Sequence, residues 1–303
     1  MKTKRDIEQE ITDKIIAQLE EGVAPWRKSW AGAQGWALRE NGVPYRGYNQ
    51  FLLSLSGYSN PYWVTYNKAA ELAGLKKDSK GKWIKEDGKG VLPGEKGTHV
   101  YFFKKLKIKD KVTGDDKIIP LIKFYSVFNV GQCGGLPEKY DPKPVERTEV
   151  ERDAAVESYI ANIGADVRHG GDRAFYIPSQ DRIQLPEVDD FDNYVSYAGT
   201  SIHEHAHWTG HESRLDRNIK NANGTKDYAR EELVAECSAA LVCGHLGLEV
   251  EPREDHASYL KSWLDVLRGD KTALRKAFSK AQEVVDFLDA QQPVVEEKEK
   301  EAA

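Results

Sequence analysis

Apolar residues follow helical spacing in some stretches of this chain and strand spacing in others. Isoleucine and leucine recur every three or four positions over residues 7–19, which predicts an amphipathic helix. A continuous apolar run at residues 100–103 predicts a strand. Between residues 174 and 185, apolar positions alternate on both sides of a polar turn, which predicts a β-hairpin. Helices and strands in separate stretches indicate an α+β fold.

Two further helices are predicted in the second half of the chain. The first carries an apolar stripe, begins near Asp190 or Asp192, either of which can cap it, and ends before Gly210. The second covers residues 228–246 and is nearly uncharged over residues 237–244, which indicates that it is buried. Carboxylates on a buried helix need a cation or hydrogen-bonding partners.

The length and the distribution of charge both indicate two domains. The chain has 303 residues, enough for two separate cores. Residues 1–130 hold 23 Lys and Arg against 15 Asp and Glu, a balance of +8, whereas the whole chain has a net charge of −5. We expect an α+β first domain and a mostly helical second domain with a small antiparallel sheet. The expected segments are a first domain at 1–135, a linker at 136–148, a second domain at 149–290 and a disordered charged tail at 291–303.

Nothing in the composition indicates a membrane or export. No apolar run approaches the roughly 20 residues of a membrane span, and the first residues lack the apolar core of a secretory signal. The three cysteines, Cys133, Cys237 and Cys243, do not make a disulfide framework. We therefore expect a cytoplasmic protein with no membrane partner.

The most informative motif is His203-Glu204-His205-Ala206-His207, which has the H-E-x-x-H spacing of zinc hydrolases. Histidines at i and i+4 project from one face of a helix, so both imidazoles can reach a single metal ion. Glu204 is then placed to take a proton from a water at the metal, which makes it the expected general base. His205 lies on a different face and is not expected to be a ligand. The alternative is a polar helix end with solvated histidines.

A third ligand is expected from the helix at residues 228–246, because catalytic zinc usually has three protein ligands and one open position. Glu232 and Glu236 lie at i and i+4 on one face of this helix. We expect Glu232 to bind the metal and Glu236 to orient an imidazole from a second layer. Glu231 and Glu236 remain alternative ligands, and a solvated acidic face is the alternative to all of them.

His211 follows the motif but does not fit the spacing of metzincins. Gly210 occupies the glycine position of that pattern, but Ser213 stands where the third histidine belongs. We therefore place His211 in the second layer around the metal ligands. His211 and Tyr228 are also the two side chains considered as donors to an oxyanion. Trp208 is expected to pack in the core.

Aromatic residues in the first half of the chain are interleaved with lysine and arginine. Five of the seven tryptophans lie there, several of them close to basic residues. Such a surface suits single-stranded nucleic acid, because bases stack on aromatic rings at about 1–3 kcal/mol each while cations follow the phosphates. The alternative is that the tryptophans are core residues and the lysines belong to solvated loops.

A set of short strings occurs in one order from about residue 7 to residue 287. In the first half they are Pro25-Trp26-Arg27-Lys28-x-Trp30, Tyr45-Arg46-Gly47-x-Asn49, Trp63-x-Thr65-Tyr66, Gly94-Glu95-Lys96-Gly97 and Val127-Phe128-Asn129. In the second half they are His203-Glu204-x-x-His207-x-Thr209-Gly210-His211, Ser213-Arg214-Leu215 and Tyr228-Ala229-x-Glu231-Glu232-Leu233-x-Ala235-Glu236. The whole set resembles ArdC-type antirestriction proteins, whose N-terminal domain also occurs in some TraC-type plasmid primases.

This resemblance implies a protein of conjugative plasmids that protects incoming DNA from host restriction enzymes. Its first domain would bind single-stranded DNA, and its second would have a zincin-like metallopeptidase fold. The resemblance places metal binding on His203, His207 and Glu232, and the general-base role on Glu204. The residues on which it places DNA contacts are Trp26, Arg27, Tyr45, Arg46, Trp63, Tyr66 and Lys96.

Two classes of function follow from these expectations. In the first, a Zn²⁺ centre, with Mn²⁺ as the alternative ion, cleaves or engages host restriction-modification proteins near single-stranded plasmid DNA. In the second, the protein is a non-enzymatic DNA binder or a blocker of restriction enzymes, and its metal site is structural. A nuclease or primase is less favoured, because no paired-carboxylate motif for two-metal chemistry stands out in the sequence.

Overall fold

The computed structural model describes residues 6–27, 36–109, 115–142, 148–217, 219, 225–248 and 257–293. The chain forms two compact units. Residues 30–146 make up the first, which we call the sheet unit. Residues 1–29 and 147–303 make up the second, which we call the helical unit. Within the described ranges, none of the helices is both long enough and apolar enough to span a bilayer.

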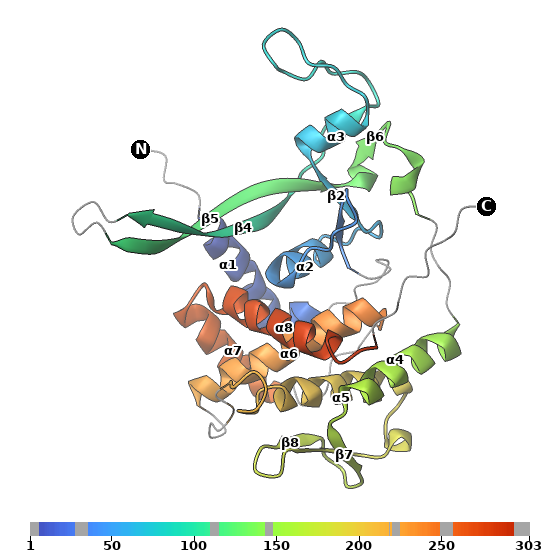
Figure 1. Cartoon of the computed structure of the whole chain (residues 1–303), viewed down its shortest axis with the longest axis vertical. Coiled ribbons are helices and arrows are strands. Elements are labelled where there is room, and N and C mark those ends of the chain that lie inside the picture. The colour runs from blue at the N-terminus through green and yellow to red at the C-terminus, as the bar shows by residue number, and fades with distance from the viewer. Residues whose placement is uncertain are drawn as a thin grey trace. The chain divides into compact units, whose positions relative to one another are not determined.

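The sheet unit is built on a four-stranded sheet with the strand order β1-β2-β5-β4. Its β1 and β2 are parallel, and the other pairs are antiparallel. Figure 1 shows that β4 and β5 continue as a long hairpin. The elements of the main sheet are β1 (Leu38–Arg39), β2 (Tyr62–Thr65), β4 (Thr98–Lys109) and β5 (Asp116–Asn129). The others are α2 (Gly47–Ser54), α3 (Tyr66–Leu72), β3 (Gly90–Val91), η2 (Val130–Gln132), β6 (Cys133–Gly134) and η3 (Glu138–Tyr140).

Several motif residues of the sheet unit hold its backbone together. The side-chain amide of Asn49 accepts a hydrogen bond from the Tyr101 N–H at 2.7 Å and donates one to the Tyr101 carbonyl at 2.8 Å, so it occupies the outer edge of β4. Gly97 lies where a β-carbon would be only 3.0 Å from Cβ of Ser126. Asn129 caps the turn that follows β5 by accepting a hydrogen bond from the Gly131 N–H at 3.0 Å. These residues build the fold, which gives them a role independent of any ligand.

The helical unit combines six helices of eight or more residues in the described ranges with a small three-stranded sheet of order β7-β9-β8. The predicted hairpin at 174–185 forms as the antiparallel pair β8–β9, and β7 adds to β9 in parallel, so the sheet is mixed and not purely antiparallel. The first elements are α1 (Ile7–Glu20), η1 (Pro25–Arg27), α4 (Glu149–Ile163), β7 (Asp166–His169), β8 (Phe175–Ile177) and β9 (Arg182–Leu185). The others are η4 (Val188–Asp190), α5 (Tyr194–Trp208), α6 (Lys226–Leu246), α7 (Ala257–Gly269) and α8 (Ala273–Asp289).

The N-terminal helix packs with the helical unit, whereas the sequence analysis assigned residues 1–135 to a single first domain. The apolar face of α1 is buried at Ile15 and Leu19, and α1 lies against α7. The Thr12 hydroxyl donates to the Lys271 carbonyl at 3.0 Å. Trp26, in η1, is 1% exposed and meets the ring of Trp263 edge-on at 5.3 Å. An amphipathic stripe shows that a helix needs a partner but does not identify that partner, so the sequence could not place α1.

Replacing Trp26 with alanine is expected to destabilise the helical unit by about 3–5 kcal/mol, because a large aromatic side chain leaves a cavity in a packed core. Chemical denaturation followed by circular dichroism measures this loss. Tyr66→Ala is the matched control: this side chain is 43% exposed, and its loss should change stability by less than about 0.5 kcal/mol. A Trp26→Ala protein that unfolds at the wild-type midpoint would contradict the packing described here.

Candidate metal centre

Helix α5 carries the two histidines of the H-E-x-x-H motif. Its N-cap is Asn193, whose side chain accepts a hydrogen bond from the Ser196 N–H at 2.9 Å. The cap is therefore Asn193, whereas the sequence predicted Asp190 or Asp192. Asp190 ends the preceding η4 turn and accepts from the Glu187 N–H instead. The helix runs to Trp208, and most of its last three turns are buried.

Helix α6 supplies carboxylates to the same place. Thr225 caps its N-terminus by accepting from the Tyr228 N–H at 3.2 Å, and Gly247 ends it in the left-handed conformation. Glu232 and Glu236 are both buried on this helix, and α6 packs against α5. Two helices that are separate in sequence thereby bring buried imidazoles and buried carboxylates together.

His203, His207 and Glu232 form a compact cluster of possible metal ligands. The two Nε2 atoms lie 3.2 Å apart. The Glu232 oxygens lie 3.6 Å from Nε2 of His203 and 3.4 Å from Nε2 of His207. Ligands bonded to zinc at about 2.0–2.2 Å in a tetrahedron stand about 3.3–3.6 Å from one another. The two Nε2 atoms and the Glu232 carboxylate, which turns one oxygen toward each histidine, therefore have nearly the spacing of ligands around one ion, and these residues fit a divalent metal.

The electrostatics of the cluster also favour a cation. Burial alone would raise the pKa of Glu232, but the adjacent His207 and His203 outweigh it and lower that pKa far below its usual range. Burial would lower the pKa of His207, but Glu232 and Glu231 raise it well above its ordinary value. These shifts mean that the carboxylates attract positive charge to the imidazoles, and a divalent ion can provide that charge in place of protons.

Each imidazole has a second carboxylate at its other nitrogen. Glu236 Oε1 lies 3.2 Å from Nδ1 of His203, and Glu231 Oε1 lies 3.4 Å from Nδ1 of His207. Carboxylates in this position fix the ring orientation and leave Nε2 directed at the metal. Glu236 thus stands where the sequence analysis expected an orienting group. Glu231, which was weighed as a ligand, faces Nδ1 of His207 and not the cluster of Nε2 atoms.

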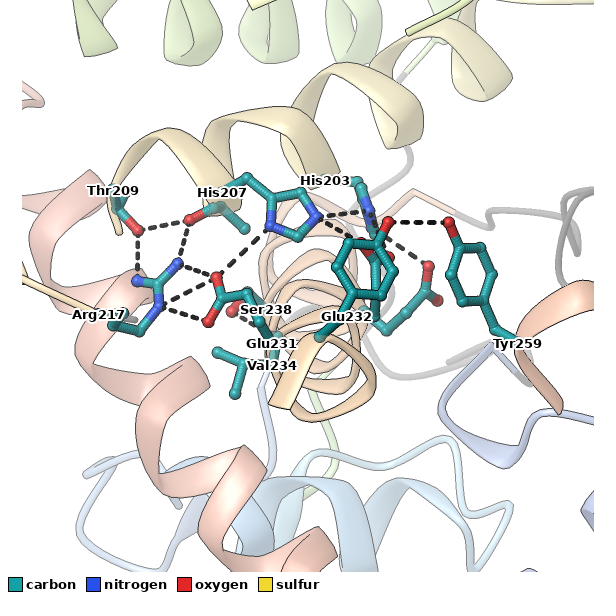
Figure 2. A network of polar contacts seen from close by, with 12 residues as sticks. His203, His207, Thr209, Arg217, Glu231, Glu232, Val234, Ser238 and Tyr259 are labelled. Atoms are coloured by element: carbon teal, nitrogen blue, oxygen red, sulfur yellow. Dashed lines mark hydrogen bonds and ion pairs between the residues drawn. The ribbon is translucent and has the colours of Figure 1, made fainter. Parts of the chain in front are cut away.

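Arg217 holds Glu231 in place, as Figure 2 shows. Its guanidinium donates to Glu231 at 2.8 Å, to the Thr209 hydroxyl at 2.8 Å and to the Ala206 carbonyl. A β-carbon on Gly210 would lie 2.6 Å from Cγ2 of Ile219 and 3.0 Å from the Arg217 guanidinium. Gly210 therefore does more than stop α5, because it lets the loop that carries Arg217 approach. Arg217 is not among the residues predicted from the sequence, and only its position shortly after the histidine motif could have drawn attention to it.

Glu204 and Tyr228 also lie beside the cluster. Glu204 is 4% exposed, and its charge contributes to the raised pKa of His207. The Tyr228 hydroxyl lies 3.1 Å from the Tyr259 hydroxyl, and the Glu232 carboxylate is close enough to raise the pKa of Tyr228. Burial, together with Glu232 and Tyr259, raises the pKa of Tyr228, so its phenol keeps its proton at physiological pH.

The other polar residues of the motif lie elsewhere. His211 bonds through Nδ1 to the Ser213 hydroxyl at 2.8 Å, and its place in the second layer stays a prediction. His205 is buried and bonds to the Ser201 carbonyl at 2.7 Å, and burial lowers the pKa of His205 to about 4. Trp208 packs beneath the guanidinium of Arg214 at 3.8 Å, in agreement with a packing role.

The residues predicted to contact DNA divide into buried and exposed groups. Trp26, Tyr45 and Trp63 are almost completely buried, so their ring faces are not available for stacking and that part of the prediction needs correction. Tyr45 and Trp63 lie in a core cluster with Ala37, Leu53, Val100 and Val127. Tyr66, Arg46 and Lys96 are exposed. The side chain of Arg27 lies outside the described residues.

Comparisons with known proteins match the two halves of the chain to two different families. Residues 154–280 match a family described as a zincin-like metallopeptidase, and residues 5–128 match the N-terminal domain of the anti-restriction factor ArdC. A metal-free crystal structure of the ArdC antirestriction protein from plasmid R388 is 38% identical, with a TM-score of 0.76, and the match covers 95% of this chain and 98% of that one. Its Mn(II)-bound structure is 37% identical, with a TM-score of 0.74, and the coverage is the same.

Similar proteins extend over nearly the whole chain. The uncharacterized protein y4eC of Sinorhizobium fredii is 35% identical over 308 residues, which are 96% of this chain and 94% of that protein. The DNA primase TraC of Escherichia coli is 34% identical over 312 residues, which are 94% of this chain but only 27% of the primase. This chain thus spans about a quarter of that primase. The match over the full length to ArdC, together with both family matches, shows that the chain belongs to the ArdC antirestriction family and carries a zincin-like metallopeptidase domain.

Proposed function

We propose that this protein binds single-stranded plasmid DNA during conjugative transfer, in the cytoplasm, and that its metal centre acts on host restriction-modification proteins as a metallopeptidase. The arrangement of His203, His207 and Glu232 at mutual distances of 3.2–3.6 Å, with Glu204 buried beside them, carries this proposal. Membership of an antirestriction family supplies the biological setting.

The residues of the centre have different roles in peptide hydrolysis. A divalent ion held by His203, His207 and Glu232 would supply Lewis acidity and lower the pKa of a water molecule. The Glu204 carboxylate takes the proton of the attacking water and returns it to the leaving nitrogen. The carboxylates of Glu231 and Glu236 lie at Nδ1 of each imidazole, a position that would favour ring orientations with Nε2 free to bind the ion.

An extended peptide has a surface on which to bind near the metal helix. β8 is an edge strand of the three-stranded sheet, and α5 packs against both β8 and β9. An edge strand can pair with the main chain of a substrate and tolerate varied sequences. This arrangement supports a peptide substrate rather than a small molecule.

Zinc is the ion that this donor set favours. Two imidazoles and one glutamate, with an open position, are a common set for catalytic zinc. The Mn(II)-bound structure of the R388 protein supports manganese as the alternative, because imidazole and carboxylate ligands suit both ions.

Single-stranded DNA would contact exposed aromatic residues of the sheet unit in place of the buried tryptophans. Phe103 on β4 is 53% exposed, and Phe102 and Tyr66 are also exposed. Phe102 stands directly opposite the exposed Lys123 in the β4–β5 register. Exposed rings beside cations are the combination that stacks bases and follows phosphates.

A second function, in which the metal only stabilises the fold, is favoured by one observation. The ligands join α5 to α6, and all three are nearly buried, so an ion would cross-link two core helices. The protein would then protect DNA by binding alone. The Glu204→Gln variant, which keeps the metal ligands, distinguishes the two functions.

Purified protein is expected to hold about one divalent ion per chain, and His203→Ala or Glu232→Ala is expected to lose most of it, because two remaining ligands bind weakly. Elemental analysis by mass spectrometry measures the content. His211→Ala is the control, because this nearby histidine bonds to Ser213 and should leave the metal in place. Full metal content in the His203→Ala protein would mean that the site lies elsewhere.

Glu204→Gln is expected to retain the metal and to abolish cleavage of restriction subunits, because the amide cannot accept the proton. If proteolysis protects the DNA, protection in a conjugation assay into a restricting host should fall together with cleavage. Full protection by Glu204→Gln would favour the binding function with a structural metal.

Phe103→Ala is expected to weaken binding of single-stranded DNA by about 1–3 kcal/mol without changing thermal stability, because it removes one exposed stacking surface. Fluorescence anisotropy at several salt concentrations measures the affinity. Trp63→Ala is the comparison, since this residue is 2% exposed and its loss should unfold the sheet unit. Wild-type affinity in Phe103→Ala would remove the β4–β5 hairpin from the DNA site.

A further inference from the structure

The metal cluster contains a proton acceptor for water, in Glu204, but the reaction also needs a donor to the oxygen that becomes negatively charged. Of the two side chains considered for this part, His211 has its Nδ1 engaged by the Ser213 hydroxyl. Tyr228 remains. It lies one turn before Glu232 on α6, a separation that puts both side chains on one helical face.

The phenol of Tyr228 is held in a fixed position. Its hydroxyl lies 3.1 Å from the Tyr259 hydroxyl, on the face of α6 that also carries Glu232. Its ring stacks on Tyr259 of α7, with centroids 6.2 Å apart and planes at 26°. Figure 2 shows Tyr259 approaching the cluster from the side opposite Arg217.

The support for Tyr259 continues into the core. Tyr259 stacks on Trp263 at 5.8 Å, and Trp263 meets the buried Trp26 edge-on at 5.3 Å. Four rings from α6, α7 and η1 thus form a continuous column that ends at the Tyr228 hydroxyl. A side chain fixed in this way loses little entropy when it forms a hydrogen bond in the transition state.

We propose that Tyr228 is a catalytic residue whose phenol donates a hydrogen bond to the carbonyl oxygen of a bound peptide as negative charge develops there. This role rests on the proposed metallopeptidase function. Tyr259 is a positioning residue: its O–H donates to the Tyr228 oxygen once the Tyr228 proton turns toward the substrate. Such a chain of two hydroxyls polarises the donor and strengthens its hydrogen bond. No proton leaves either tyrosine in this step.

The competing role for Tyr228 is structural, in which it only steadies Glu232. The two roles differ in what they do to the metal. Removing the hydroxyl of a residue that only holds Glu232 should lower the affinity for the metal. Removing the hydroxyl of an oxyanion donor should instead lower the affinity for an anionic ligand at the open position of the metal.

The test uses the full chain loaded with Co²⁺, whose visible absorption reports both the metal and its ligands. Acetohydroxamate is the probe, because its anionic oxygen resembles the developing oxyanion. We expect Tyr228→Phe to bind Co²⁺ within about threefold of wild type but acetohydroxamate at least about 10-fold more weakly, as loss of a hydrogen bond to a charged group implies. Tyr259→Phe should weaken the probe by a smaller factor. Tyr58→Phe, an exposed change in the sheet unit, should match wild type.

The outcomes separate this role from the proposed function. Wild-type affinity for acetohydroxamate in Tyr228→Phe would overturn the catalytic role, as would a wild type that binds Co²⁺ but not the probe. A loss of Co²⁺ affinity in Tyr228→Phe as large as that in Glu232→Ala would assign Tyr228 to the structural role. A wild type that binds no Co²⁺ would instead overturn the metal centre itself, and the role of Tyr228 with it.

Discussion

The packing of α5 against α6 places four glutamates close to two imidazoles in the buried interior. The positions of the surrounding residues of the helical unit depend on this arrangement. Glu204, Glu232 and Glu236 are buried, and Glu231 is nearly so. Against their four negative charges the described part of the chain sets one guanidinium, from Arg217. With neutral histidines the balance is −3, and a divalent ion brings it to −1. Carboxylates at this depth need such compensation, so the same packing that buries them also calls for the ion.

The ring of partners around the ligands explains why residues far from the ion occupy fixed positions. Arg217 ties Glu231 to the end of α5 through the Ala206 carbonyl and the Thr209 hydroxyl. The orientation of His207 therefore depends on a loop that touches no ligand directly. Gly210 admits that loop, because a β-carbon there would collide with Ile219. The string of residues after the second histidine is thus as much a part of the centre as the ligands themselves.

Local patterns in the sequence predicted the elements of this centre well, because helical periodicity and motif spacing are local properties. The helix of the histidines, the helix of the glutamates and the hairpin before them all form, and His203, His207 and Glu232 come together. The cap was wrong by one to three positions, since Asn193 competes with the neighbouring aspartates for the same role. Arg217 could not be predicted, because its partner Glu231 becomes a neighbour only after α5 and α6 pack.

Composition was a poor guide to which aromatic residues are exposed, for a related reason. Aromatic residues next to lysines have the same composition whether they face a core or a ligand, and Trp63 and Tyr45 proved to be core residues. The side chain of Asn49, a motif residue, hydrogen-bonds to the backbone of Tyr101. A motif in this part of the chain is therefore explained by the requirements of the fold and does not by itself indicate a ligand.

Trp26 is a further motif residue that builds the fold. It belongs to the motif of the N-terminal family, yet it packs in the helical unit and closes the column of rings that ends beside Glu232. Residues 6–27 are also tied to this unit by the bond from Thr12 to the Lys271 carbonyl and by the ion pair of Glu8 with Arg275. The boundary between family matches in sequence and the boundary between folding units therefore differ. The helical unit that carries the metal centre therefore includes a segment that precedes the entire sheet unit in the chain.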